Sequence, residues 1–198
     1  MACALLCAAL LGGCATRPRV ALLPADGEQQ LSSRESALFE RTHFSLNGRI
    51  AVSNGKDGGS GRFFWEQRGP AFTLRFVAPV GAQNWRIESQ PGQALLIESS
   101  GAVRVAATAD ELLQRELGWR VPSRSLRYWI LGMRAPESDA TPSFDETGNL
   151  TSLRQAGWQI DYLRFDPTQQ PPLPTKLFAR SGNNEVRISI RTWAFHSP

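Results

Sequence analysis

Cysteine is scarce in this chain of 198 residues, and all of it lies at one end. Cys3, Cys7 and Cys14 fall within the first fourteen residues, so the body of the chain carries no thiol. Disulfide bonds, zinc–thiolate sites and cysteine nucleophiles are therefore excluded from the body.

Residues and motifs typical of catalysis are also scarce. His43 and His196 are the only histidines, which argues against a histidine-centred acid–base site. The chain has no P-loop, no nucleophile elbow and no zinc-binding HExxH helix. The glycine-rich stretch 55–61 predicts a hairpin loop, because no helix follows it to bind phosphate. We expect no enzyme activity, no cofactor and no metal site.

The basic charge is modest and is spread along the sequence. Lysine and arginine number 22 against 18 acidic residues, which gives a net charge of +4, and Lys56 and Lys176 are the only lysines. A nucleic-acid-binding protein needs its cations concentrated on one face. This distribution instead predicts a solvated basic surface and no nucleic-acid partner.

The N-terminus has the pattern of an export signal. Its apolar run is too short for a membrane-spanning helix and ends in small residues before a cysteine. Leu11-Gly12-Gly13-Cys14 resembles the lipobox of bacterial lipoproteins, which implies a signal peptide over 1–13 and lipid on Cys14. In bacterial lipoproteins with this signal, an aspartate directly after the cysteine is associated with retention in the inner membrane. Position 15 is alanine here, so the resemblance implies the outer membrane. An ordinary secretory signal with an incidental cysteine is the alternative.

The next segment predicts a tether followed by the folded domain. Residues 14–31 mix proline, glycine and polar residues without a sustained period, which is typical of a flexible linker. Ser32 and Glu35 have capping-box spacing, so we expect a short helix to begin there. The domain is therefore predicted to cover residues 32–198.

Most of the domain has the two-residue period of β-strands. Apolar side chains alternate with polar ones from Phe44 to Val105 and again from Trp158 onward. Between these regions, Thr108 begins one predicted helix that Gly118 ends, and a second runs from Pro122 to Gly132. We predict a mainly β (α+β) fold: an open, half-closed antiparallel β-barrel with short helices covering its mouth.

One face of the predicted sheet is apolar and rich in aromatic residues. It either lines a cavity or packs as a solid core, and the sequence does not separate these two. The candidate lining residues are Phe44, Leu46, Ile50, Phe63, Trp65, Phe72, Leu74, Phe76, Trp85, Ile87, Leu95, Ile97, Trp129, Trp158, Ile160 and Tyr162.

The turn between two of the predicted strands is unusually apolar. Ala78-Pro79-Val80-Gly81-Ala82 joins the strand that ends at Val77 to the strand that begins at Trp85. Hairpin tips normally carry polar residues because they face water. The bare Val80 at this tip therefore points to a contact other than water.

Several segments together resemble one family, the outer-membrane lipoprotein receptor LolB. They occur in the family's order over nearly the whole chain after Cys14. The segments are Gly48-Arg49-Ile50-Ala51-Val52, Arg62-Phe63-Phe64-Trp65, Pro79-Val80-Gly81, Leu126 to Gly132, Gly157-Trp158 with Tyr162, Leu173-Pro174 and Trp193.

The resemblance implies a function and a set of partners. A LolA/LolB-like barrel would accept the acyl chains of a client lipoprotein from the periplasmic carrier LolA and insert them into the inner leaflet of the outer membrane. It would act as a monomer, lipid-anchored at Cys14 and facing the periplasm. The resemblance also places Val80, where the family usually has leucine, in a loop that engages the membrane. A LolA-like carrier without insertion activity and a lipid-anchored envelope scaffold are the alternatives.

Overall fold

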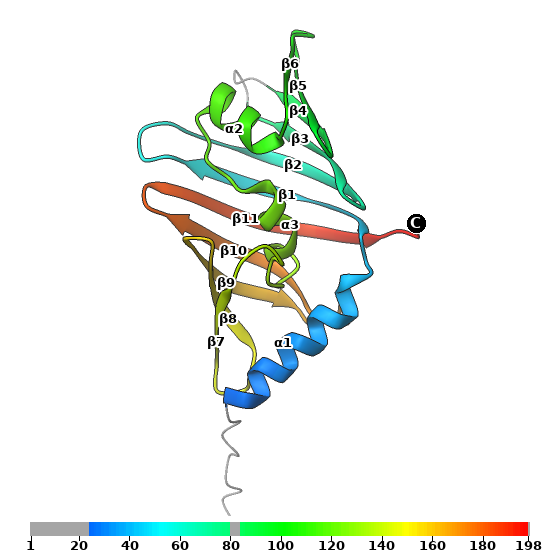
Figure 1. The fold of residues 1–198 in the computed structure, drawn as a ribbon, viewed down its shortest axis with the longest axis vertical. Helices are drawn as coiled ribbons and strands as arrows, with labels where there is room; N and C mark the ends of the chain where they lie inside the picture. Colours follow the sequence, from blue (N-terminus) through cyan, green and yellow to red (C-terminus); the bar gives the residue numbers. More distant parts are fainter. Residues whose placement is uncertain (1–23, 80–83, 198) are drawn as a thin grey trace, which may run out of the picture.

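The structure, a computed structural model, describes residues 24–79 and 84–197, and within them eleven strands form one antiparallel sheet (Figure 1). The order across the sheet is β6-β5-β4-β3-β2-β1-β11-β10-β9-β8-β7. The strands are β1 (His43–Ser53), β2 (Gly58–Arg68), β3 (Ala71–Val77), β4 (Trp85–Gln90), β5 (Gln93–Glu98), β6 (Val103–Ala106), β7 (Ala140–Phe144), β8 (Leu150–Gln155), β9 (Trp158–Asp166), β10 (Leu173–Ser181) and β11 (Asn184–Phe195). Because β6 and β7 do not pair, the barrel stays open, which confirms the predicted architecture.

Two helices interrupt the strands where the sequence predicts them. In α2 (Ala109–Leu117) the Thr108 side chain accepts a hydrogen bond from the Glu111 amide, and Gly118 ends the helix at a φ of 69°. α3 (Ser123–Trp129) follows directly, and both helices lie on the concave side of the sheet (Figure 1). No helix in the described parts of the chain is long and apolar enough to cross a membrane.

The first helix begins earlier than predicted. α1 (Pro24–Phe39) starts at Pro24, and the expected cap Ser32 lies inside it, where its carbonyl accepts from the Ser36 hydroxyl at 3.0 Å. A proline in the first turn and Asp26 near it favour this start. Residues 24–31 are therefore helix rather than tether, while residues 14–23 lie outside the described residues.

The pairing of β1 with β11 joins the two halves of the sheet and explains the glycine at position 48. The register shifts between Asn47 and Gly48, so the two backbones come unusually close there. A Cβ atom at position 48 would clash with the carbonyl oxygen of Ser189. Glycine is therefore required at this bulge by the close approach of backbone to backbone.

Candidate functional site

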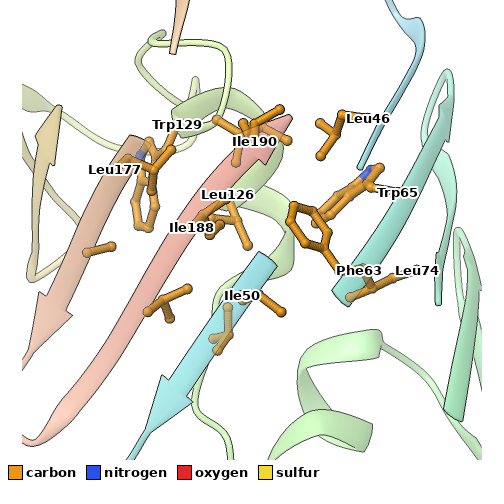
Figure 2. Close-up of a cluster of buried hydrophobic side chains, with 14 of the residues drawn as sticks. Leu46, Ile50, Phe63, Trp65, Leu74, Leu126, Trp129, Leu177, Ile188 and Ile190 are labelled. Atoms are coloured by element: carbon orange, nitrogen blue, oxygen red, sulfur yellow. The ribbon is translucent and has the colours of Figure 1, made fainter. Parts of the chain in front are cut away.

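The concave side of the sheet is a continuous apolar interior that the two short helices cover. Figure 2 shows inward side chains of the central strands converging beneath Leu126 and Trp129 of α3. These side chains are almost completely buried, with Phe63 at 1 % and Trp129 at 0 % exposure. The interior divides into two parts, one under α2 and the other under the end of α3.

Under α2, the connection that follows it and the first part of α3 lies a cavity of about 30 Å³. Its walls are apolar except for Ser123. They are Ile50, Val52, Phe63, Trp65, Phe72, Leu74, Phe76, Trp85, Leu113, Trp119, Val121, Ser123, Leu126, Ile130 and Ile188. This volume is about that of one water molecule, whereas ligand pockets usually enclose about 300–1,000 Å³. As the structure shows it, this cavity is therefore too small to hold an acyl chain.

Aromatic side chains build the cavity wall. Phe76 stacks on Trp85 with ring centroids 5.0 Å apart, and Trp119 meets both rings edge-on at 5.7 Å. On the neighbouring wall Trp65 stacks on Phe72 at 4.9 Å. Among the described residues, the Trp65 indole alone of these rings donates a hydrogen bond, to the Gln67 side chain at 2.9 Å, and apolar contacts hold the others.

The segment that covers the cavity runs from the end of α2 to Val121. At its turn, Gly118 allows the Trp119 amide to donate to the Leu113 carbonyl at 2.9 Å, which directs the Trp119 ring inward. The cover is attached to the strands by a hydrogen bond from the Asn54 side chain to the Gly118 carbonyl at 3.1 Å. Its inner surface meets the sheet through Leu113, Trp119 and Val121, which are apolar.

Under the end of α3 the interior is fixed by polar contacts. The buried Gln155 side chain accepts from the Trp129 indole at 2.8 Å and from the Ala135 amide at 2.9 Å. It also donates to the carbonyls of Ala135 and Ser138. The Tyr162 hydroxyl donates to the Trp129 carbonyl at 3.0 Å, and burial raises the pKa of this hydroxyl, which keeps it protonated.

The sixteen predicted lining residues separate into three groups. Seven surround the cavity: Ile50, Phe63, Trp65, Phe72, Leu74, Phe76 and Trp85. Seven others belong to the buried core away from it: Phe44, Leu46, Ile87, Trp129, Trp158, Ile160 and Tyr162. The third group, Leu95 and Ile97, is not inside the barrel.

The prediction for Leu95 and Ile97 is wrong because it takes the opposite face of β5. Leu95 pairs with Glu88 and Ile97 with Arg86, whereas Leu96 pairs with the fully buried Ile87. Three consecutive apolar residues hide the two-residue period here. The two-residue turn between the paired Gln90 and Gln93 sets the register, and counting from that turn identifies Ala94 and Leu96 as the inward residues.

Sequence reasoning missed about half of the cavity wall. The missed residues are Val52, Leu113, Trp119, Val121, Ser123, Leu126, Ile130 and Ile188. Trp119 had a usable signal, because an apolar residue directly after a glycine helix cap commonly packs back against its helix. For the others, only the position of the helices over the sheet decides which apolar side chains face the cavity.

The remaining predicted site residues lie at or beyond the edge of the described structure. Cys14, Val80 and Gly81 lie outside the described residues. Pro79, the last described residue after β3, is exposed. Just before it, the Ala78 amide donates to the Asn84 side chain at 2.9 Å, which joins the end of β3 to the residue before β4.

The described residues form no cluster of side chains that could bind a metal. Across residues 24–79 and 84–197, no three histidine, cysteine or acidic side chains gather closely enough to hold a metal ion. The fold and its interior define a half-open antiparallel barrel with a helix-covered apolar cavity. A protein of this class is suited to apolar molecules.

The comparisons with known proteins agree with this class. A crystal structure of a DUF1329 family protein from Desulfovibrio piger has a similar fold, with a TM-score of 0.53 over 86 % of this chain and 92 % of that one. At 9 % sequence identity, that likeness concerns the fold alone.

Similarity to known sequences identifies the family to which this chain belongs. The model of the outer membrane lipoprotein LolB family matches residues 42–193. The outer-membrane lipoprotein LolB of Xanthomonas campestris pv. campestris strain 8004 is 32 % identical over 92 % of this chain and 90 % of its own length. The LolB proteins of Nitrosococcus oceani (34 %, 85 % of each chain) and Pseudomonas putida W619 (31 %, 93 % and 91 %) are similarly close. The chain belongs to the LolB family of outer-membrane lipoproteins.

Proposed function

We propose that this protein receives lipoproteins from a LolA-type periplasmic carrier, holds their acyl chains in the interior beneath α2, and inserts them into the inner leaflet of the outer membrane. Membership of the LolB family supports the receptor role and the outer-membrane location. The observation that carries the assignment of the site is the cavity with an apolar wall.

The energetics of the cargo explain why such an interior is needed. Each buried methylene is worth about 0.8 kcal/mol, so exposing a long acyl chain to water costs on the order of 10 kcal/mol. An apolar interior lowers this barrier. Transfer from carrier to receptor to bilayer can then follow differences in affinity, without nucleotide hydrolysis or any catalytic residue.

The small volume of the cavity supports release as well as binding. A cavity of about 30 Å³ accepts an acyl chain only if its cover moves outward, and that movement subtracts from the net affinity. Weak net binding is useful in a receptor that must hand its cargo to the membrane. The cover of α2 and Trp119 is the part that we expect to move.

Lipid on Cys14 is the proposed anchor. Stable attachment generally needs more than one acyl chain, and the lipobox resemblance implies several on this cysteine. Residues 15–23 separate it from α1 in the sequence. Under this arrangement the barrel stays at the membrane while cargo passes through it.

Uptake of an apolar fluorescent probe by the non-lipidated Cys14→Ala chain tests the cavity. We expect Leu74→Gln to weaken uptake about tenfold, because an amide placed in the wall has no partner there. Leu95→Gln is the matched control: it makes the same change on the outer face of the neighbouring hairpin and leaves uptake unchanged. Circular dichroism confirms folding of both variants. Absence of uptake by the parent chain would contradict the proposal and favour a scaffold with a solid core.

We also propose that Val80 touches lipid when cargo leaves the cavity. Val80→Glu is expected to leave probe uptake and cargo acceptance intact but to slow delivery into liposomes, because a carboxylate does not enter the apolar layer. Val105→Glu is the control, since Val105 is an exposed valine at the far edge of the sheet. Equal delivery by the Val80 variant and the control would show that this turn has no membrane role.

A further inference from the structure

The outer face of the sheet carries cations that the sequence keeps far apart. The strand register places Arg62 of β2 opposite Arg49 of β1, and Arg49 opposite Ser189 of β11. Lys176 of β10 pairs with Ser189, and Arg164 of β9 pairs with Lys176. Arg62, Arg49, Lys176 and Arg164, which we name the cationic row, therefore cross five adjacent strands over about 19 Å.

All four side chains of the cationic row are exposed, because the alternate residues on these strands fill the interior. None of them makes an ion pair or a side-chain hydrogen bond with any described residue. Other cations on the same strands do: Arg187 is 2.9 Å from Glu185, and Arg180 is 3.1 Å from Asp161. Like charges directly opposite each other destabilise a sheet. Folding alone does not account for the cationic row.

The cationic row borders a groove with an apolar floor. The groove has a volume of about 910 Å³ and is lined by Arg49, Arg62 and Lys176 together with Val77, Phe178 and Leu163. Leu163 is 58 % exposed, although it is a large apolar side chain. Ala78 and Pro79 also line the groove, directly before the turn proposed to touch lipid.

We infer that the cationic row and its groove bind the anionic headgroups of bilayer phospholipids. Arginine forks match phosphate oxygens, and the exposed Leu163 side chain, with the half-buried Phe178 ring beside it, suits the apolar layer just beneath the headgroups. This surface rests on the proposed function, since it holds the barrel against the leaflet into which cargo passes. Because Ala78 and Pro79 line the groove, headgroup binding brings the end of β3 and the residue directly before Val80 to the same membrane surface.

Co-flotation with vesicles of phosphatidylethanolamine and phosphatidylglycerol tests this inference. The chain without the predicted signal peptide and with Cys14→Ala is used, so that the lipid anchor does not mask weaker binding. Each cation near an anionic surface strengthens binding about fivefold, so Arg49→Gln with Arg62→Gln should weaken it about 25-fold. High salt should weaken binding of the parent chain, and phosphatidylcholine vesicles should not bind it.

Arg120→Gln with Arg124→Gln is the matched control, because it removes two exposed cations on the helix side of the barrel. We expect this control to bind the anionic vesicles within about twofold of the parent chain. Equal losses in both double variants would show that only net charge matters and would overturn the inference. The inference would also be overturned if the Arg49 and Arg62 double variant bound vesicles normally but failed to accept cargo from the carrier. That result would assign the cationic row to an acidic protein partner.

Uptake of the apolar probe is measured in parallel. If uptake fails while vesicle binding still depends on the cationic row, the proposed function is contradicted but this inference is not.

Discussion

The two parts of the interior both lie inside the barrel but are held together by different forces. Beneath the end of α3, Gln155 alone satisfies two donors and two acceptors, and Tyr162 adds another hydrogen bond. Beneath α2, stacked rings and aliphatic side chains surround the small cavity, and Trp65 is the one ring there that has a hydrogen-bond partner among the described residues, the Gln67 side chain at 2.9 Å.

This difference indicates which part can exchange its contacts for cargo. An acyl chain that displaces Trp119 replaces one apolar contact with another, so little free energy is lost at the wall. Displacing Trp129 would leave buried donors and acceptors without partners, at about 1–3 kcal/mol each. We therefore assign binding to the part around the cavity and a fixed structural role to the part beneath the end of α3, around Trp129.

The largest expected loss of stability comes from a substitution in the part beneath the end of α3. Gln155→Leu leaves the Trp129 indole and the Ala135 amide without their acceptor, so the free energy of unfolding should fall by about 4 kcal/mol. Urea denaturation followed by tryptophan fluorescence measures this loss. Gln159→Leu on the same hairpin is the control, since Gln159 bonds only the side chains of Arg154 and Asp161 near the surface. A similar small loss in both variants would remove the distinction between the two parts.

A smaller loss of stability, joined to a gain in binding, is expected at the cover. Trp119→Ala should lower the free energy of unfolding by about 3 kcal/mol, because part of the ring's volume is left empty. The same enlargement should strengthen apolar-probe uptake several-fold. Trp129→Ala serves for comparison: it should destabilise more and should not strengthen uptake. Equal gains in uptake from both substitutions would mean that cargo has access to both parts.

Much of the fold follows from local patterns in the sequence. The alternation from Phe44 onward predicts the strands, and the Thr108 cap and Gly118 predict α2 almost to the residue. Where local patterns are ambiguous, prediction fails: Leu95, Leu96 and Ile97 carry no readable period, and Pro24 competes with Ser32 as a helix start. For β5, the tight turn between Gln90 and Gln93 decides which side chains face inward. For α1, the segment before Ser32 is helical and buries Leu31 against the barrel.

The site is less accessible to sequence reasoning than the fold. Periodicity identifies inward side chains but not which of them meet a helix and which meet empty space, so Phe63 and Ile160 look alike in the sequence. The cationic row is hidden for a related reason. Lys176 neighbours Ser189 within the last hairpin, but Arg49 reaches Ser189 only through the pairing of β1 with β11, so cations that are scattered in sequence gather on the folded surface.

Hydrogen–deuterium exchange with and without a synthetic diacylglyceryl-cysteine peptide tests most directly whether the cover, from the end of α2 to Val121, moves to admit acyl chains. On loading, the account predicts faster exchange at the amides of residues 113–121, including the Gly118 and Trp119 amides that close the end of α2. It predicts unchanged exchange for residues 129–135 and for β8. Faster exchange in residues 129–135 with no change in residues 113–121 would contradict the account.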